Sequence, residues 1–477
     1  MAKRIIIITS FIAVLAIGVF TIPSLVKEQR IVGTPYVPIV GEYQIDKYKS
    51  MLEEAIDRYE KETPSNRVVR EPLDPLNDIT EPRYKKTDGG GFDNAEAEDS
   101  GEAVLLFTGD IMCRKEQQEA AAEKYGRPDF SDSFLYMKDI FADADLVAGN
   151  LETTISESTK YTLEENITGD LPNRNAPSTF LDAIRDAGFD VVTTCNNHCL
   201  DGGVRSVYET IFHLDQYGLM HTGTFLNAED RASHPFVMAD VNGIKVAILS
   251  YGDFFNRHDK NLTDEGRECL VNKYDTQKAK DDIAAAKAAG AEFIVVYTHL
   301  GREFSHDVIK KQIKEAREAA EAGADFIVSL HPHVLQKNDS IKTSDGRIVP
   351  VSYCLGNFIS SMEENDRRET AVLKLRLKKE GDKVGGDDSS DGGDDSDGSG
   401  DGNSDGGDGG DGSSDGGSVK IASLTYIPCY TLPEYEGNVY TVVPLTPERV
   451  KGNKELKKEL EHIKGYLGDQ VPCEYKY

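Results

Sequence analysis

The feature that most constrains this chain is a regular alternation of short apolar runs with longer amphipathic stretches across residues 104–354. The apolar runs are Val104–Thr108, Leu146–Ala148, Val191–Thr194, Val246–Ser250, Phe293–Tyr297, Phe326–Ser329 and Val349–Cys354. The stretches with helical i, i+3, i+4 spacing are Thr179–Ala187, Val204–Tyr217, Thr276–Ala289 and Asp307–Ala322. Strands that alternate with helices predict an α/β fold, a layered α+β sandwich with buried sheets.

A segment of extreme composition interrupts this pattern at Gly385–Ser418. It holds only Gly, Ser, Asp and one Asn, with eleven Asp, which predicts a disordered acidic insertion. A weak Ca²⁺-binding tract is the alternative, although calcium loops place a bidentate Glu at a fixed offset and this segment has no Glu. Apolar runs return at Val419–Ile427 and Val439–Val443. We therefore expect one domain over residues 103–446, followed by a C-terminal segment 447–477 that begins with a charged helix at Pro447–Tyr466.

The N-terminus has the pattern of an export signal. Lys3 and Arg4 precede an apolar run, Ile5–Val26, which is long enough to cross ~30 Å of hydrocarbon as a helix. We predict an uncleaved signal anchor over residues 1–30, held by membrane lipid, with a single pass and an extracytoplasmic body. The alternative is a secreted protein, released after signal cleavage.

Residues 31–102 are expected to connect this anchor to the domain. Gln44–Glu62 has helical periodicity and predicts a juxtamembrane helix, whereas Thr63–Glu102 is rich in Pro, Asp, Glu, Gly and Asn and predicts a flexible stalk. The seven cysteines match no zinc framework and are expected to be free or locally buried thiols.

The charge of the chain excludes one class of partner. With 54 basic and 83 acidic residues, the net charge is −29, and nucleic acid needs a basic footprint. Five basic residues nevertheless fall near the expected ends of strands, so a local basic rim is one interpretation and scattered solvated charges are the other. They are Arg114, Lys115, Arg174, Arg302 and Lys337.

Polar side chains follow five of the predicted strands. They are Asp110; Asn150 and Glu152; Asn196, Asn197, His198 and Asp201; His299 and Glu303; and His331 and His333. Because the carboxyl ends of parallel strands line one crevice, we expect these groups to converge. Carboxylates, amides and imidazoles without thiolates favour Mn²⁺, Fe or Zn²⁺, and a shared carboxylate could bridge two ions.

The same residues form ordered motifs that resemble a known family. The motifs are Thr108-Gly109-Asp110, Gly149-Asn150-Leu151-Glu152, Asn196-Asn197-His198-x-x-Asp201-x-Gly203, His299-x-Gly301-x-Glu303, His331-Pro332-His333-Val334-Leu335-Gln336 and Tyr353-x-Leu355-Gly356-Asn357-Phe358. They resemble those of the CapA-type poly-γ-glutamate capsule biosynthesis proteins, a family similar in fold to the calcineurin-like metallophosphoesterases. Leu300 and Ser329 stand where the family often has Trp and Gly. Asp110-Ile111-Met112 lacks the His of the Asp-x-His motif that opens typical metallophosphoesterases. The sequence is therefore compatible with a site for one ion or for two.

The resemblance implies a division of roles. The implied metal ligands are Asp110, Glu152, Asn197, His299, His331 and His333. His198 is the implied general acid, and Asp201 and Glu303 are further candidate catalytic residues.

Two functions follow from the resemblance. One is a metal-dependent hydrolase or transferase of poly-γ-glutamate or capsule synthesis, acting on a phosphoester or an isopeptide-type bond. The other is a non-catalytic component that binds or exports the polymer. An anionic cell-surface polymer and the membrane subunits of a polymer synthase are the expected partners.

Overall fold

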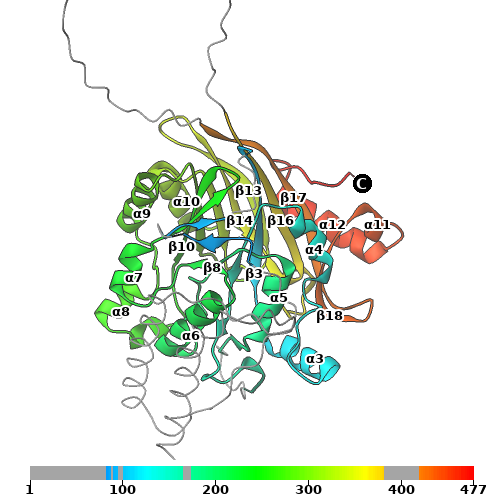
Figure 1. Ribbon diagram of the computed structural model, residues 1–477. Coiled ribbons are helices and arrows are strands. Elements are labelled where there is room, and N and C mark those ends of the chain that lie inside the picture. Colours follow the sequence, from blue (N-terminus) through cyan, green and yellow to red (C-terminus); the bar gives the residue numbers. More distant parts are fainter. Residues whose placement is uncertain (1–81, 88–89, 95–99, 165–172, 381–417, 477) are drawn as a thin grey trace, which may run out of the picture. The chain divides into compact units, whose positions relative to one another are not determined.

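Two mixed β-sheets form the centre of the described part of the protein (Figure 1). The structure is a computed structural model, and it describes residues 82–87, 90–94, 100–164, 173–380 and 418–476. All of these residues fall within one compact unit, Val40–Tyr477.

The first sheet has the strand order β18-β17-β16-β3-β4-β7-β8. Its strands are β3 (Glu102–Ile111), β4 (Leu146–Leu151), β7 (Val191–Thr193), β8 (Met220–Thr222), β16 (Glu369–Lys379), β17 (Val419–Tyr435) and β18 (Asn438–Pro444), and β15 (Asn357–Ile359) pairs with β3. The strands β3, β4, β7 and β8 are parallel, whereas β16, β17 and β18 add to the β3 edge in antiparallel pairs.

The second sheet has the order β1-β2-β9-β10-β11-β12-β14-β13. Its strands are β1 (Lys85–Lys86), β2 (Phe92–Asp93), β9 (Val237–Val241), β10 (Ile244–Gly252), β11 (Phe293–His299), β12 (Phe326–Leu330), β13 (Leu335–Lys342) and β14 (Ile348–Leu355). The strands β10, β11, β12 and β14 are parallel. Each sheet therefore contains a parallel stretch whose strands end at one edge.

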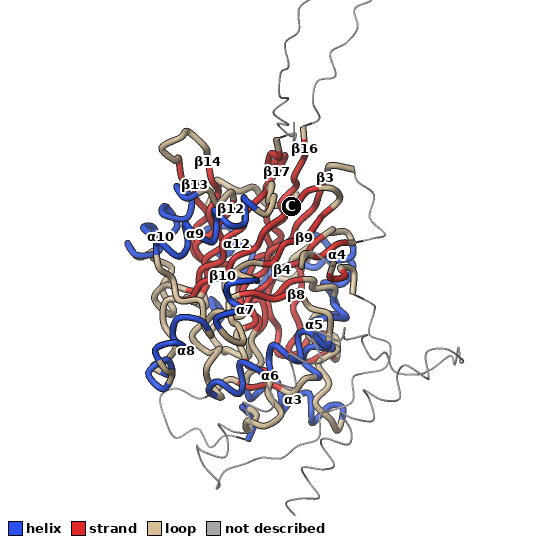
Figure 2. Tube along the Cα trace, turned by 60° about the vertical axis from the view of Figure 1, so that its left-hand side comes forward, coloured by secondary structure: helices blue, strands red, loops and turns tan. Residues whose placement is uncertain are grey.

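The two sheets pack face to face. Phe107 of the first sheet lies 5.1 Å from Phe326 of the second, measured between ring centroids, and both rings belong to a core cluster drawn from both sheets. Helices cover the outer faces: α5 (Thr179–Ala187) packs on the first sheet, and α9 (Thr276–Ala288) and α10 (Lys310–Ala322) pack on the second. Figure 2 shows strands in the middle of the body with helices around them. The predicted α/β layered sandwich is confirmed.

The remaining elements are shorter or lie at the edges. They are α3 (Lys115–Tyr125), α4 (Lys138–Ala142), α6 (Gly203–Gln216), α7 (Ala228–Ser233), α8 (Asp264–Cys269), β5 (Thr154–Ile155), β6 (Asn175–Ala176) and the 3₁₀ turns Leu135–Met137, Thr162–Glu164, His258–Asn261 and Asn365–Arg367. The predicted strands and helices of residues 104–354 are all present, with ends shifted by a few residues.

The prediction of one C-terminal helix at residues 447–466 is wrong. The chain forms α11 (Pro447–Val450) and then α12 (Lys454–Leu467). Gly452 between them has a φ of +80°, which a helix does not allow, and the Asn453 side chain accepts a hydrogen bond from the Leu456 amide at 3.1 Å to start α12. The helix α12 contacts β13 of one sheet and β16 and β17 of the other.

The last part of the predicted stalk is also different from the expectation. Residues 85–86 and 92–93 form β1 and β2, and β2 pairs with β9. Tyr84 is buried and donates a hydrogen bond to the Asp145 carbonyl at 2.7 Å. The prediction from composition was wrong for these residues, because two short strands and one tyrosine are enough to attach a polar segment to the edge of an existing sheet.

Several predictions fall on residues outside the described ranges. They concern the signal anchor at 1–30, the juxtamembrane helix and the acidic insertion, of which only Ser418 is described. The strands on either side of the insertion pair with each other as far as Lys379 and Val419. Among the described residues, no helix is both long and apolar enough to span a bilayer. All seven cysteines are described; none of them forms a disulfide bond and six of them are buried, which agrees with the prediction.

Candidate metal centre

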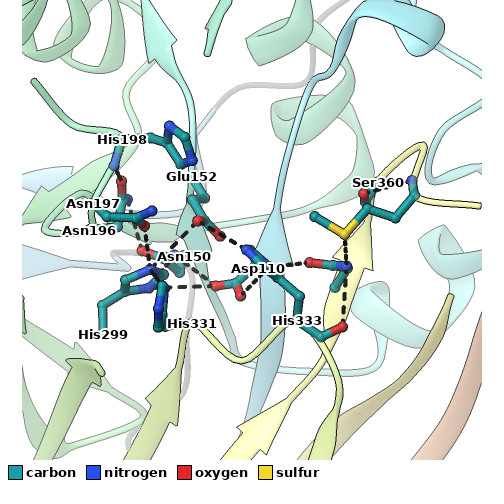
Figure 3. A network of polar contacts seen from close by, with 12 residues as sticks. Asp110, Asn150, Glu152, Asn196, Asn197, His198, His299, His331, His333 and Ser360 are labelled. Atoms are coloured by element: carbon teal, nitrogen blue, oxygen red, sulfur yellow. Dashed lines mark hydrogen bonds and ion pairs between the residues drawn. The ribbon is translucent and has the colours of Figure 1, made fainter. Parts of the chain in front are cut away.

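The polar residues predicted from the strand ends converge at one edge of the sandwich (Figure 3). Asp110 lies at the end of β3, Glu152 follows β4, and His299 ends β11. Asn197 follows β7, whereas His331 and His333 follow β12. Both parallel stretches therefore supply ligands to one point, because the two sheets pack with these carboxyl ends on the same side. We call Asp110, Glu152, Asn197, His299, His331 and His333 the strand-end centre.

The position of Asp110 depends on the glycine before it. A Cβ on Gly109 would lie 2.1 Å from the Gly356 carbonyl oxygen. Only a glycine allows this close approach, and the Asp110 amide then donates a hydrogen bond to the same carbonyl at 3.0 Å. The Gly-Asp pair thus fixes the carboxylate beside β15.

Asp110 and Glu152 are fully buried carboxylates with unsatisfied oxygens. Asp110 Oδ1 accepts a hydrogen bond from Asn150 Nδ2 at 2.8 Å, but Asp110 Oδ2 and both Glu152 oxygens have no hydrogen-bond donor among the described residues. Burial raises the pKa of Glu152 to about 8. Burial and the neighbouring Glu152 raise the pKa of Asp110 well above its usual range. A bound cation would satisfy these oxygens, because burying an unpaired carboxylate has a high free-energy cost.

The three histidines beside these carboxylates are held neutral. Burial lowers the pKa of His299 to about 4, and it lowers the pKa of His331 and His333 well below the usual value, with His299 adding to the effect. His299 Nε2 lies 3.2 Å from His331 Nδ1 and 3.5 Å from Glu152 Oε1. Neutral imidazole is the form that binds metal ions, so these rings are ready to act as ligands.

The backbone at His331 and His333 is strained. The φ angles are +102° and +60°, in a region that side-chain-bearing residues seldom occupy. Residues in such conformations concentrate at functional sites, where the surrounding structure holds them. Pro332 lies between the two histidines. The rings of Phe254 and His331 pack edge to face, with 4.7 Å between their centroids.

Three asparagines contact the histidines of the centre: Asn150, Asn357 and Asn197, which is itself a member of the centre. Asn357 Oδ1 lies 2.8 Å from His333 Nδ1, so the proton of this imidazole is held on Nδ1 and Nε2 is left to face Glu152 Oε1 at 3.7 Å. Asn197 Oδ1 lies 2.8 Å from His299 Nε2, and Asn150 Nδ2 lies 3.4 Å from His299 Nδ1. Sequence analysis counted Asn150 among the polar groups expected to converge, but not among the ligands, and it placed Asn357 in a motif without giving it a role.

His198 and Asp201 form a pair next to the centre. His198 Nδ1 lies 2.6 Å from Asp201 Oδ2. Burial opposes charging of this imidazole, but the charge and hydrogen bond of Asp201 outweigh it and raise the pKa of His198. Asn196 donates a hydrogen bond to the Leu151 carbonyl at 2.8 Å and accepts one from the His198 amide at 3.1 Å, so it holds the loop rather than facing the ligands.

Glu303 and most residues of the predicted basic rim are less buried than the ligands of the strand-end centre. Glu303 is exposed on the segment after β11. Its negative charge adds to the effect of burial in raising the pKa of Glu152. Lys115 and Lys337 are ion-paired with Glu119 and Asp339, and Arg302 is exposed. Arg174 is 8% exposed; burial and then the charge of Arg114 lower its pKa to about 10.

The donor set fits a divalent cation. Ligand atoms of Glu152, His331 and His333 lie within 4.8 Å of one another, as do those of Asp110, Glu152 and His299. Glu152 is common to both groups and has two unsatisfied oxygens, so the same carboxylate faces both.

Two curated relatives carry capsule-related names. PGA biosynthesis protein CapA from Bacillus subtilis (strain 168) is 29% identical over 276 residues, which are 58% of this chain and 68% of that protein. Capsule biosynthesis protein CapA from Bacillus anthracis is 28% identical over 287 residues, which are 58% of this chain and 64% of that protein. The matched part of this chain thus spans about two thirds of each relative.

Among solved structures, the chain is similar to the calcineurin-like phosphoesterase YfkN from Bacillus subtilis. It is 15% identical, and the match covers 76% of this chain and 99% of that chain with a TM-score of 0.37.

The family match rests on the part of the chain that builds the site. The family described as "Bacterial capsule synthesis protein PGA_cap" matches residues 104–362, more than half of the 477 residues. This range begins within β3 and extends past β15, so it contains the whole strand-end centre. The chain therefore belongs to the PGA_cap family of bacterial capsule synthesis proteins.

Proposed function

We propose that this protein is a metal-dependent hydrolase or transferase of poly-γ-glutamate capsule synthesis or processing. The observation that carries the proposal is the pair of buried carboxylates, Asp110 and Glu152, whose unsatisfied oxygens face three neutral imidazoles. A purely structural site would not need this arrangement, because neutral polar or apolar side chains would fill the same volume at lower cost.

The ligands of the ion would be the six residues of the strand-end centre. Carboxylate, amide and imidazole donors favour Mn²⁺, Fe or Zn²⁺, and the shared Glu152 is compatible with one ion or two. Lewis acidity toward an oxygen of the scissile bond is the chemistry that such an ion supplies when bound.

His198 would act as the general acid. Asp201 holds Nδ1 at 2.6 Å, so the Nε2 of the protonated ring is the atom that can donate to a leaving group. The raised pKa of His198, due to Asp201 overcoming the effect of burial, keeps this ring protonated closer to neutral pH. Asp201 is then the orienting carboxylate, and Glu303 is an exposed carboxylate at the rim.

An anionic cell-surface polymer is the proposed substrate. The net charge of −29 repels such a polymer in general, so local cations are needed to admit it. Arg174 is almost fully buried near Glu152 and Asp201, and the positive charge of Arg114 is close enough to lower its pKa. Two adjacent guanidinium groups suit a carboxylate or a phosphate.

The test compares the wild-type protein with His198→Ala, after loading with Mn²⁺ or Zn²⁺, on γ-glutamyl oligomers and on phosphodiesters. We expect equal metal content and a loss of turnover of about 10²–10⁴-fold. Loss of metal from the His198 variant would make His198 a ligand. If neither protein turned over any substrate and cells with the variant still made capsule, the non-catalytic polymer-binding role would replace the enzyme.

The proposed location is the outer face of the cell membrane, with the anchor formed by the apolar run at residues 5–26. Membrane subunits of a polymer synthase are the proposed neighbours there. Protease added to intact protoplasts should digest the body of the protein, and complete protection would reject this orientation.

A further inference from the structure

A second group of metal-capable side chains lies away from the strand-end centre. It consists of Glu369, the first residue of β16, with Glu459 and His462 of α12. The helix lies beside β16 and β17 in Figure 1, and it contacts both strands. We call these three residues the helix–strand cluster.

Glu459 occupies an unusual position on its helix. The buried apolar stripe of α12 consists of Leu456, Leu460, Ile463 and Leu467, and Glu459 lies within this stripe at 0% exposure. Glu369 opposite it is also 0% exposed. Carboxylates are almost never buried so fully unless they are paired, and here two of them face each other.

The three side chains offer ligand atoms close together. His462 Nδ1 lies 3.1 Å from Glu369 Oε1 and 3.7 Å from Glu459 Oε2. The residues Glu459 and His462 are three apart, so they lie on one face of the helix. The same Glu-x-x-His spacing supplies metal ligands from helices in carboxylate-bridged proteins.

One oxygen of each carboxylate is not satisfied by a neighbouring side chain. Glu369 Oε2 and Glu459 Oε2 are buried and have no hydrogen-bond donor in the described part of the chain. Glu459 Oε1 receives a long hydrogen bond from Asn365 Nδ2, at 3.4 Å, and lies 3.5 Å from the exposed ammonium of Lys458. Asp366 adds further negative charge nearby.

We propose that the helix–strand cluster is a second divalent-cation site, independent of the strand-end centre, that fastens α12 to β16. Two carboxylates and one imidazole suit Zn²⁺ or Mn²⁺. Ligands bound to one tetrahedral ion at about 2.0–2.2 Å lie roughly 3.3–3.6 Å apart, and His462 Nδ1 lies 3.1 Å and 3.7 Å from the two carboxylate oxygens. The side chain of His462 is 45% exposed, so the ion has a route from solvent and room for water ligands.

The competing occupant is a proton shared between the two carboxylates. Burial and the neighbouring Glu459 raise the pKa of Glu369, as a shared proton requires. A shared proton would join only the two carboxylates and leave His462 with its 3.1 Å contact to Glu369 Oε1, whereas a cation would be bound by all three side chains.

The test measures Zn²⁺ uptake by the EDTA-stripped full-length protein. The variant His331→Ala weakens the strand-end centre, and any Zn²⁺ that it still binds reports on other sites. We expect one equivalent fewer in His331→Ala/His462→Ala than in His331→Ala alone. We also expect Zn²⁺ to slow amide hydrogen exchange over residues 454–467 only while His462 is present. His462 is half-exposed, so its loss should leave the fold intact.

Two further variants make the result specific. Glu459→Gln should abolish the same equivalent, and Glu461→Gln, on the exposed side of the same helix, should leave Zn²⁺ uptake unchanged. Equal Zn²⁺ uptake with and without His462 would overturn the proposal and leave the shared proton as the occupant.

Discussion

The strand-end centre and the helix–strand cluster use the same chemistry in two different settings. Both combine buried carboxylates with imidazole, and in both the carboxylate oxygens lack donors among the described residues. The side chains of His299 and His333 in the first are 3% exposed, whereas the side chain of His462 in the second is 45% exposed. The first lies where parallel strands end, and the second joins a helix to a strand.

The two sites also differ in how firmly their ligands are held. Asn357 and Asn197 each lie 2.8 Å from a histidine nitrogen of the strand-end centre. The polar support of the helix–strand cluster is the longer contact of Asn365, at 3.4 Å. Ligands that are oriented in advance lose less freedom when an ion binds. We therefore expect the strand-end centre to bind metal more tightly.

The largest expected effect is loss of the ion from the strand-end centre. His331→Ala and Glu152→Ala should each lower the bound metal to the amount held by the other sites. The reason is that each substitution removes one ligand from the strand-end centre. The fold should survive, since these residues lie at the rim of the sheets. Elemental analysis and circular dichroism of the purified variants provide the measurement.

A matched control is Glu303→Gln, which removes an exposed carboxylate from the segment after His299. Its metal content should equal that of the wild type. Normal metal content in both ligand variants would reject the strand-end centre as a metal site. It would also reject the expectation that this centre binds metal more tightly than the helix–strand cluster.

Much of the first site could be predicted because its ligands follow a simple rule. Asp110, Glu152 and His299 each come within four residues of the end of an apolar run, and parallel strands bring such residues to one edge of the sheet. The orienting role of Asn357 could not be read in the same way. It depends on β15 lying beside β3, a pairing that spans about 250 residues of sequence.

The helix–strand cluster shows why other parts could not be predicted. Glu369 and Glu459 are 90 positions apart, and the acidic insertion lies between them. Burial of Glu459 was visible only as one charged residue in the stripe of Leu456, Leu460 and Ile463. In the same way, Tyr84 and the short strands after it have a composition typical of a linker, and only the neighbouring sheet edge orders them.

An intermediate effect is expected from the support of the strand-end centre. Asn357→Ala removes the partner of His333 Nδ1 and frees that imidazole to rotate. Loss of such a partner lowers metal affinity by about 10–100-fold. The matched variant Asn365→Ala, next to Glu459, should leave the strand-end affinity unchanged. Zn²⁺ titration of both variants separates the two supports, and equal effects on the strand-end centre would show that the sites are coupled.

The smallest effect concerns a buried carboxylate that belongs to neither site. Glu315 of α10 has a side chain that is 5% exposed and lies 3.7 Å from Lys311 Nζ. Burial raises its pKa to about 7, against the opposing charge of Lys311. A raised folded-state pKa stabilises the protein at pH values below the unfolded-state pKa, and this stabilisation is lost as the pH rises through about 7.

Glu315→Gln should therefore raise the free energy of unfolding at pH 8 by about 1–2 kcal/mol, less than the full pKa shift implies, because the Lys311 ion pair is also lost. The gain should shrink toward zero at pH 5. On the same helix, hydrogen bonds from Lys314 and Thr276 outweigh burial and lower the pKa of Glu318, so Glu318→Gln should have the opposite sign. Urea unfolding of metal-free protein at both pH values measures this difference. A Glu315→Gln variant that is less stable than the wild type at pH 8 would show that burial alone does not penalise a carboxylate in this fold, and the need for cations at the two metal-capable sites would lose part of its support.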